Sequence, residues 1–349
     1  MPTILFTGYP GFLGAELLPR LLGRDPSLTA RCLVQPKFAA LARERAAALG
    51  PRVEIVEGDI TRPVEARADD VVEVWHLAAV YDLMVPRDIG LAVNVDGTRH
   101  VLDVAARAPA LRRFHYVSTC YVSGCWPGLF HESDLVKGQR FNNFYEETKY
   151  LAEVLVQERM RGGLPATIYR PAVVVGDSAT GATQKFDGPY FVMQWLLRQP
   201  RVAFLPVAGK PSRYRFNMVP RDFIIRAIEH LSGRPASAGK VYQLADPDPL
   251  TVSEIIDVLA VATGRRVVRL PLPKSAAKFA LARVPGVHRL MRIPPAAVDY
   301  FAHPTLYDTA GAMADLRGSG IEVPRFRDYA PRLVEFMRAH PEVGAAAMA

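Results

Sequence analysis

Several features that mark whole classes of protein are missing from this chain of 349 residues. No apolar run approaches the ~20 residues that a membrane-spanning helix needs. The chain begins directly with an expected strand, so we expect no signal peptide. There is no internal repeat and no long low-complexity tract. The three cysteines, Cys32, Cys120 and Cys125, show no metal-ligand spacing, and their odd number provides no disulfide framework. These absences predict a globular cytoplasmic protein without a bound metal.

The charge balance is positive, with 43 Lys and Arg against 35 Asp and Glu, which is a formal net charge of +8. The positive charges are scattered and accompany no nucleic-acid-binding motif, so we expect no nucleic-acid partner. An arginine-rich composition alone can explain this excess, but it also attracts polyanions such as NADPH and coenzyme A. Hydrophobic residues make up 50% of the chain, enough for a large core or for two lobes of one enzyme.

A glycine-rich segment follows the first strand. The apolar run Ile4–Phe6 is typical of a buried parallel strand, and Gly8, Gly11 and Gly14 follow with the spacing G-x-x-G-x-x-G. Residues 15–22 then place four leucines on one face of an expected helix. Strand, glycine loop and helix form the context of a dinucleotide site, because the pyrophosphate can approach the free N–H groups of the helix. The alternative is a glycine-rich turn that holds no ligand.

The choice of cofactor depends on the end of the second expected strand, Arg31–Val34. NAD enzymes usually carry Asp or Glu about 20 residues beyond the glycines, where it bonds the ribose 2′-hydroxyl. Here Gln35 stands at that point and Lys37 follows it. No carboxylate is present to repel a 2′-phosphate, and Lys37 or Arg43 could neutralise one. We therefore expect NADP rather than NAD, although both cations can equally be solvated surface charges.

Hydroxyl and small side chains follow three further expected strands. The strand 53–59 ends in Gly-Asp, and the strand 71–77 runs into His76-Leu-Ala-Ala79. Such small residues leave room for a cofactor, although ordinary packing also explains them. The strand Arg113–Val117 runs into Ser118 and Thr119. A hydroxyl at the carboxyl end of a parallel strand lies where α/β active sites form.

Tyr145 and Lys149 lie four residues apart in a segment of helical character, 146–161, and therefore share one helix face. A free phenol with a pKa of about 10 is a weak acid at neutral pH, and a nearby ammonium lowers that pKa. Tyr145 can then exchange a proton with an alcohol or hemithioacetal oxygen, while the Thr119 hydroxyl holds the same oxygen. Pairs of this spacing are common on surface helices, but the preceding Ser-Thr strand end favours catalysis.

These motifs together resemble the extended short-chain dehydrogenase/reductases over nearly the whole chain. The matching pieces are TGYPGFLG, GDI, HLAA, NVDGT, YVSTCYVSG, YEETK and YRPAVVVG. The resemblance implies an α/β fold, with a Rossmann-type doubly wound parallel sheet and a smaller, mostly helical C-terminal substrate lobe. It also implies a catalytic triad of Thr119, Tyr145 and Lys149, supported by Asn94. Thr119 is chosen over Ser118 because it stands five residues before Gly124, as the active hydroxyl of the family does.

The same resemblance places the cofactor along the strand ends. The expected cofactor-binding residues are Gly8, Gly11, Phe12, Leu13, Gly14, Gln35, Lys37, Asp59, Ile60, Leu77, Ala78, Ala79, Tyr145, Lys149, Pro171, Ala172 and Val173. Pro171 to Val173 would lie near the nicotinamide.

Within that family the chain looks most like the thioester-reductase and fatty acyl-CoA reductase (male-sterility-like) branch, through GFLG, VSTCYVSG, FNNFY and VVVGDSATG. This branch implies reduction of a carrier-bound or CoA-bound acyl thioester to an aldehyde, sometimes onward to an alcohol, with an acyl carrier protein or CoA as partner. The early glycine loop predicts no adenylation or carrier domain upstream, and no room is left for a long C-terminal domain. A free-standing ketone or aldehyde reductase is therefore a competitor. A sugar-nucleotide epimerase or dehydratase with bound NAD, and a non-catalytic NADP-sensing or scaffold protein, are further alternatives.

We expect residues 1–178 to form the NADP-binding domain, with 216–246 returning to it, and residues 179–215 and 247–349 to form the substrate lobe. Within that lobe, the segment 265–293 carries eight Lys or Arg, no acidic residue and interleaved apolar side chains. A basic amphipathic segment can lie on an anionic membrane surface, or guide an acyl carrier protein or CoA. A solvated helix covering the substrate lobe is the plainer interpretation. The oligomeric state is left open.

Overall fold

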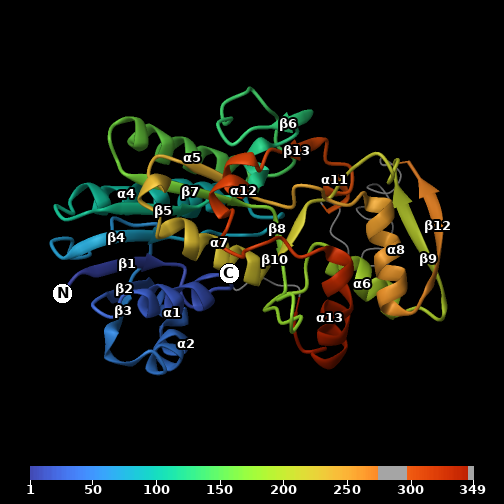
Figure 1. Cartoon of the computed structure of the whole chain (residues 1–349), viewed down its shortest axis with the longest axis horizontal. Coiled ribbons are helices and arrows are strands. Elements are labelled where there is room, and N and C mark those ends of the chain that lie inside the picture. The colour runs from blue at the N-terminus through green and yellow to red at the C-terminus, as the bar shows by residue number, and fades with distance from the viewer. Residues whose placement is uncertain (274–296, 345–349) are drawn as a thin grey trace.

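A computed structural model describes residues 1–273 and 297–344. Seven parallel strands form the main sheet in the order β11-β7-β5-β4-β1-β2-β3, so the chain crosses over after β3 as in a doubly wound fold (Figure 1). The strands are β1 (Thr3–Thr7), β2 (Thr29–Val34), β3 (Val53–Glu57), β4 (Val71–His76), β5 (Arg113–Val117), β7 (Ala166–Pro171) and β11 (Val241–Leu244). This arrangement confirms the predicted fold class.

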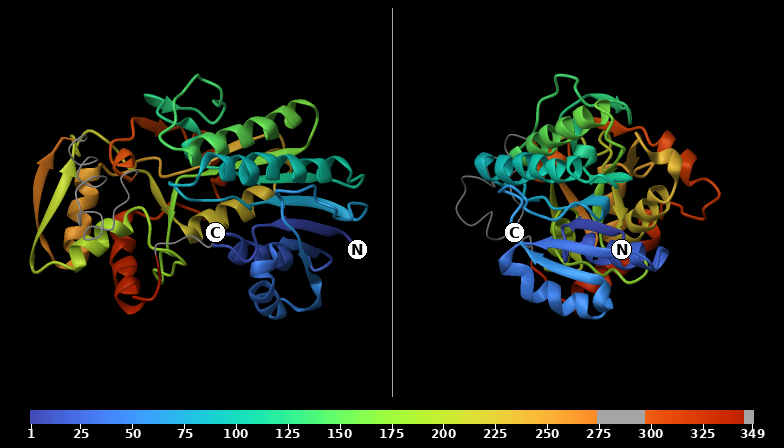
Figure 2. Two further views of the ribbon diagram at one scale, coloured as in Figure 1. Left: turned by 180° about the vertical axis from the view of Figure 1, so that it is seen from behind. Right: turned by 90° about the vertical axis from the view of Figure 1, so that its left-hand side faces the viewer.

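Helices cover both faces of the sheet, as the views in Figures 1 and 2 agree. One face carries α1 (Gly14–Arg24), α2 (Pro36–Ala47) and α7 (Arg221–Ser232), and the other carries α4 (Gly97–Ala106) and α5 (Phe144–Arg161). The alternation of side chains along β1 explains the two layers. Ile4 and Phe6 pack into the cluster with the α1 leucines, whereas Leu5 packs into the cluster with α4 and α5.

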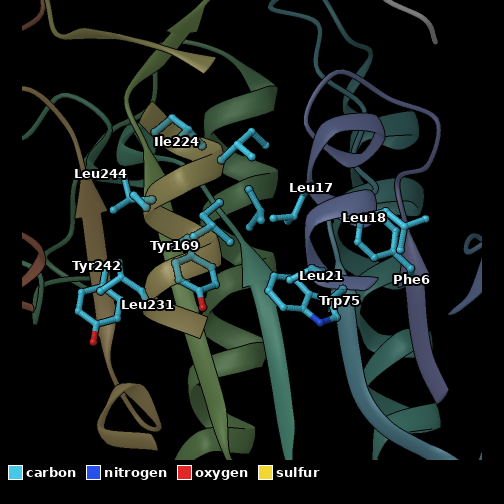
Figure 3. Packing of buried hydrophobic residues seen from close by; sticks show 14 of the residues in the cluster. Phe6, Leu17, Leu18, Leu21, Trp75, Tyr169, Ile224, Leu231, Tyr242 and Leu244 are labelled. Atoms are coloured by element: carbon cyan, nitrogen blue, oxygen red, sulfur yellow. The ribbon is translucent and has the colours of Figure 1, made fainter. Parts of the chain in front are cut away.

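The core beneath α1 and α7 is largely aromatic and aliphatic (Figure 3). Phe6, Trp75, Tyr169 and Tyr242 come from four different strands and are all at most 1% exposed. Trp75 also stacks on the ring of His115, with 3.8 Å between the ring centroids. Burial of a large apolar side chain contributes roughly 1.5–3 kcal/mol, so this layer holds the strand ends in fixed register.

A second lobe lies beyond the carboxyl ends of the strands (Figure 1). Its core joins α6 (Tyr190–Leu197), α8 (Val252–Thr263) and α13 (Phe326–Ala339) with the parallel strand pair β9 (Val202–Ala208) and β12 (Arg266–Leu272). Thr251 caps α8 in a capping box with Glu254. The remaining elements are α3 (Arg87–Gly90), β6 (Gly128–Phe130), β8 (Val173–Val175), β10 (Met218–Pro220), α11 (Ala297–Tyr300), β13 (Thr305–Tyr307), α12 (Ala310–Leu316), a π-helical turn at Leu91–Asp96 and short 3-10 turns at Gly50–Arg52, Cys120–Ser123 and Pro235–Ser237.

Two expectations need correction. The strand expected at 53–59 ends at Glu57, and the N–H of Gly58 makes the last hydrogen bond to β2, to the carbonyl of Val34. The start of the basic segment 265–293 is the strand β12 rather than part of a helix, because the β-branched Val267 and Val268 pair with β9. Its remainder, 274–293, lies outside the described residues.

Candidate active site

The glycine loop between β1 and α1 has no room for side chains at its key positions. Gly8 has φ +91°, and a Cβ there would lie 2.9 Å from the backbone of Leu77 and Ala78 at the end of β4. A Cβ on Gly11 or Gly14 would collide with the carbonyl oxygen of Gly8. The loop therefore brings backbone against the strand ends and aims the α1 N-terminus at the sheet edge. This cradle fits a pyrophosphate, which needs close backbone approach and free N–H groups.

The side chains of Phe12 and Leu13 point into the protein. Leu13 packs against the core beneath α1, and the Phe12 ring lies 5.3 Å from the guanidinium carbon of Arg221 at the start of α7. Leu13 stands at the N-cap position of α1 and cannot cap it with a side chain. The N–H groups of Ala15, Glu16 and Leu17 donate instead to the backbone carbonyls of Gly11 and Leu13.

Gln35 and Lys37 follow the end of β2, and two arginines of α2 lie nearby. Gln35 donates from Nε2 to Asp59 Oδ2 at 3.0 Å, and Lys37 Nζ lies 5.0 Å from the ring centre of Phe38. Arg43 pairs with Glu57 on β3. Arg45 instead donates to the carbonyl of Pro10 at 3.0 Å and joins α2 to the glycine loop. No sequence pattern pointed to Arg45, because this contact spans 35 residues.

The ends of β3 and β4 form the next part of the edge. Ile60 is buried against Gly97, where an added Cβ would lie 2.7 Å from its Cδ1. The N–H of Ala78 donates to Thr7 Oγ1 at 3.2 Å, while Leu77 is half-buried and Ala79 is exposed. His76 is hydrogen-bonded on both sides, by Thr7 and by Thr98. Burial, and then the charge of Lys149, lower the pKa of His76 to about 3, so it is a neutral core histidine.

The two hydroxyls after β5 have different environments. Thr119 Oγ1 accepts the N–H of Tyr121 at 3.3 Å and donates to the carbonyl of Pro171 at 3.4 Å, and its side chain also hydrogen-bonds that of Tyr145. Ser118 Oγ points the other way and donates to Glu153 Oε2 at 2.5 Å. Of these two hydroxyls, Thr119 is thus the one that faces Tyr145.

Tyr145 and Lys149 project from the first turns of α5, whose N-terminus is capped by the Asn143 side chain. Both side chains are buried, at 7% and 3% exposure. Lys149 Nζ donates to Tyr116 Oη and to the carbonyl of Val117, each at 3.0 Å. Burial lowers the pKa of Lys149 to about 7.

We expected Lys149 to lower the pKa of Tyr145, but in the structure the pKa of Tyr145 is raised. Burial raises the pKa of Tyr145, and the hydrogen bond with Thr119 only partly opposes this effect. The physical reason is visible in the geometry. The Lys149 ammonium is directed at Tyr116 and at the backbone of β5, while the phenol of Tyr145 lies in a poorly hydrated position.

Asn94 lies in the π-helical turn and ties the loop after β4 to α5. Its Oδ1 accepts the N–H of Val80 at 2.9 Å, and its Nδ2 donates to Thr148 Oγ1 at 3.0 Å. Because Thr148 stands between Tyr145 and Lys149, Asn94 helps to hold the helix turn that carries both.

Pro171, Ala172 and Val173 form the junction between β7 and β8. The carbonyl of Pro171 accepts the Thr119 hydroxyl, and the N–H of Ala172 donates to Leu244 of β11 at 3.0 Å. A Cβ added at Gly188 would lie 3.6 Å from Val173 Cγ1. The junction thus separates Thr119 from the second lobe.

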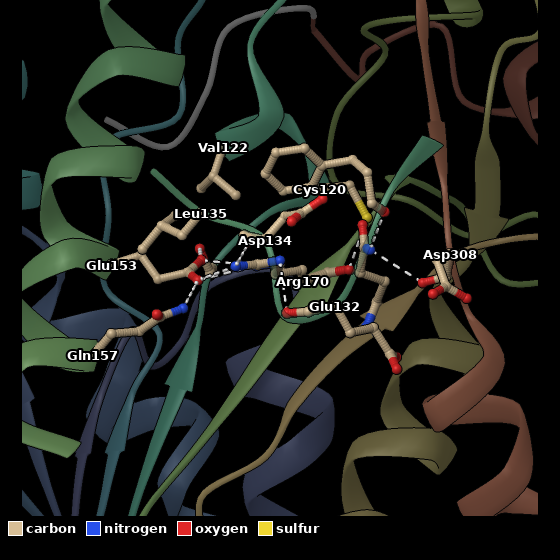
Figure 4. A network of polar contacts seen from close by, with 12 residues as sticks. Cys120, Val122, Glu132, Asp134, Leu135, Glu153, Gln157, Arg170 and Asp308 are labelled. Carbon is tan, nitrogen blue, oxygen red and sulfur yellow. Dashed lines mark hydrogen bonds and ion pairs between the residues drawn. The ribbon is translucent and has the colours of Figure 1, made fainter. Parts of the chain in front are cut away.

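A buried ion pair that sequence reasoning missed supports this arrangement (Figure 4). Arg170 and Glu153 have fully buried side chains, with Nη2 and Oε1 2.6 Å apart. Arg170 also donates to the carbonyls of Glu132 and Asp134, and Glu153 accepts from Ser118. The pair fastens α5, one turn beyond Lys149, to β7, one residue before Pro171. Its only local signal was the spacing of Glu153 from Lys149.

Four further residues near Tyr145 were also missed. Tyr81 places its ring edge-on to Tyr145, with 5.0 Å between centroids, and the ion pair of Lys185 and Asp187 lies beside Tyr81. In addition, burial raises the pKa of Glu146, the residue after Tyr145, to about 7. These contacts join segments far apart in the chain, so no local pattern marks them.

Within residues 1–273 and 297–344, no group of His, Cys, Asp or Glu could hold a metal ion. Over the same ranges, no helix combines the length and the apolar character required to cross a membrane. Cys32 and Cys120 are buried and Cys125 is partly buried, and none of these three described cysteines forms a disulfide.

The chain is similar over most of its length to several known proteins. The chain is 32% identical over 290 residues to glycine betaine reductase ATRR of Emericella nidulans, covering 74% of this chain and 22% of that protein. It is 26% identical to a 3 beta-hydroxysteroid dehydrogenase/Delta 5-->4-isomerase of Mycobacterium tuberculosis, covering 87% and 81% of the two chains. A solved terminal R domain from the myxalamid PKS-NRPS biosynthetic pathway superimposes with a TM-score of 0.81 at 27% identity, covering 98% of this chain and 92% of that one.

The fold, the glycine loop and the relatives place the chain among the extended short-chain dehydrogenases/reductases. The family model described as male sterility protein matches residues 6–228. The chain belongs to this family. It spans about a fifth of the length of the glycine betaine reductase that it resembles.

Proposed function

We propose that this protein is an NADPH-dependent reductase of a carbonyl-level acyl substrate. Its preferred substrate in this proposal is an acyl thioester presented by a carrier protein or by CoA, which is reduced to the aldehyde. The observation that carries the proposal is the convergence of Thr119, Tyr145 and Lys149 at the strand ends, beside the glycine cradle. The likeness to a reductase domain of a peptide-synthesis pathway supports the thioester.

The residues of the cradle fit a dinucleotide. The loop Gly8–Gly14 would hold the pyrophosphate, and Gln35 with Lys37 at the start of α2 would meet the 2′ position of the adenosine ribose. Support for NADP comes from the missing carboxylate at Gln35 and from the cation two residues later. When bound, NADPH supplies a hydride.

Three side chains would take part in proton transfer to the substrate oxygen. Tyr145 donates a proton to it, and Thr119 donates a hydrogen bond to it as it gains negative charge. Lys149 lies one helix turn beyond Tyr145 and has a pKa of about 7, so at neutral pH it can carry a proton and return it to the Tyr145 phenolate after Tyr145 has donated its own. Asn94 keeps the turn that carries Tyr145 and Lys149 in place.

The test is a screen for NADPH oxidation with octanoyl-CoA, the same acyl group on a carrier protein, and octanal, each beside an NADH control. The Tyr145→Phe variant should lose about 10²–10⁴-fold in turnover, while its affinity for NADPH, measured by fluorescence titration, stays close to that of the wild type. A Tyr145→Phe variant with full activity would show that Tyr145 is not the proton donor. Equal rates with NADH would contradict the cofactor assignment.

A second candidate is a ketone or alcohol oxidoreductase without a carrier. The similarity to the hydroxysteroid dehydrogenase, which extends over 81% of that protein, favours it. A steroid ketone or a β-keto acid in the same screen separates the two, because only this second function predicts faster turnover of a free ketone than of any thioester.

A further inference from the structure

One ion pair of the second lobe reaches the proposed proton donor through an aromatic ring. Lys185 Nζ lies 2.8 Å from Asp187 Oδ2, and each side chain is 20% exposed. The same Nζ lies 4.3 Å from the ring centre of Tyr81, in the loop after β4. Tyr81 in turn meets Tyr145 edge-on, with 5.0 Å between ring centroids and an interplanar angle of 83°. Cation, ring and phenol thus form one continuous set of contacts.

The loop that carries the pair is anchored on both sides. Phe186, between the two charged residues, is 1% exposed and its N–H donates to the carbonyl of Gly344 at 2.9 Å. The carbonyl of Asp187 accepts the N–H of Tyr190 at the start of α6. Gly188, with φ +54°, lies against Val173. These contacts fix Lys185 and Asp187 beside the junction that separates the two lobes.

The position matters because the surroundings of Tyr145 are poorly hydrated, so charges act there more strongly than in water. The titratable or charged groups that interact with Tyr145 are Glu146 on its own helix, Tyr81 after β4, Tyr116 on β5, Tyr121 in the turn after Thr119, and Asp187 in the second lobe. Lys149 stands one helix turn beyond Tyr145, with its ammonium directed at Tyr116. Asp187 also hydrogen-bonds Tyr81. A carboxylate placed here favours the protonated phenol, and a cation beside that carboxylate offsets the effect.

We propose that Lys185 and Asp187 act as a pair of positioning residues that set how firmly Tyr145 holds its proton during turnover. Tyr81 is the contact between this ion pair and Tyr145. Asp187 keeps the proton on Tyr145, and Lys185 prevents the carboxylate from holding it too strongly. The inference rests on the proposed function, because it assigns a task to the same phenol. It adds that the second lobe contributes to the acid–base chemistry of the site.

The reverse of aldehyde reduction provides the assay. In the oxidation of 1-octanol with NADP⁺, the alcohol loses a hydride to NADP⁺ and a proton to the oxygen of Tyr145. At a fixed pH below the titration midpoint of Tyr145, the rate of this reaction falls about tenfold for each unit by which the phenol holds its proton more firmly. The variants are Lys185→Met, Asp187→Asn and the double variant, with Lys185→Gln in reserve if Lys185→Met does not fold.

The expected signs are opposite for the two single variants. Lys185→Met leaves the charge of Asp187 uncompensated and should slow oxidation about 3–10-fold, whereas Asp187→Asn should accelerate it by a similar factor. The double variant should return to within about twofold of the wild type. Asp257→Asn, which breaks the Arg269–Asp257 pair on the second lobe, is the matched control and should change nothing.

A purely structural role makes a different prediction. It would slow all three variants together and weaken NADP⁺ binding, and that result would overturn the inference. If the three variants oxidise 1-octanol at the wild-type rate while the Tyr145→Phe variant is inactive, this inference is overturned and the proposed function stands. A fully active Tyr145→Phe variant, or a wild type that reduces neither octanoyl-CoA, nor the carrier-bound octanoyl group, nor octanal, would refute the proposed function and this inference with it.

Discussion

Replacing Lys149 with methionine should make the protein more stable at neutral or lower pH while it removes catalysis. The amine is 3% exposed, and burial lowers its pKa from 10.5 to about 7. The unfolded chain therefore binds this proton below about pH 10.5, and the folded chain binds it only below about pH 7. The folding stability of the wild type accordingly rises with pH between these two values. Below about pH 7 the full cost of charging the buried amine remains.

The magnitude follows from the two pKa values. A difference of about 3.5 units, at about 1.4 kcal/mol per unit, corresponds to about 5 kcal/mol. The methionine loses two hydrogen bonds, to Tyr116 and to the carbonyl of Val117, which contribute about 1 kcal/mol each. The net gain of the variant is thus about 3 kcal/mol at about pH 6, and it should vanish by about pH 9.5.

Urea denaturation at about pH 6 and about pH 9.5, without added nucleotide, measures both values. Lys210→Met, at an exposed position, is the control and should show no such pH dependence. A Lys149→Met variant that is less stable than the wild type at the lower pH would refute the reasoning. A difference that is the same at both pH values would do so equally, because it would show that Lys149 carries no charging cost.

Three other predictions address the cradle, the buried ion pair and the thiols. Gly8→Ala should abolish NADPH binding, measured by fluorescence titration, because φ +91° and a 2.9 Å backbone contact exclude a Cβ at this position. Gly23→Ala is the matched control: a Cβ there meets open space, so this variant should stabilise α1 by up to about 1 kcal/mol. Arg170→Met should cost about 3–5 kcal/mol in urea denaturation, because it leaves Glu153 charged and buried without a partner; a loss below about 1 kcal/mol would contradict this. A thiol reagent should label Cys125 first in the native protein and all three cysteines only in denaturant, because burial raises the pKa of both other thiols; rapid native labelling of more than one thiol would show otherwise.

Local patterns were sufficient for the parts of the site that lie on one element or one turn. The spacing of Gly8, Gly11 and Gly14, together with the strand before it and the helix after it, was enough to predict a dinucleotide site. The four-residue spacing of Tyr145 and Lys149 placed both on one helix face. Such features depend on backbone geometry over a few residues, which a sequence displays directly.

Contacts across the fold were not predictable in the same way. The sequence pointed to Arg43 and not to Arg45, and only the packing of α2 decided that Arg45 contacts the glycine loop while Arg43 pairs with Glu57. The segment 265–293 looked like one amphipathic unit, although β12 begins it because β9 offers a pairing edge.

The order of elements, the glycine spacing of the first loop and the residues proposed for proton transfer can be read from the sequence by itself, because each depends on neighbours within a few residues. The direction in which Tyr145 and Lys149 titrate was decided only by tertiary structure, since hydration and the orientation of charges depend on what packs around a side chain. The same holds for the Lys185–Asp187 pair, which reaches Tyr145 only because two lobes distant in sequence meet at the strand ends.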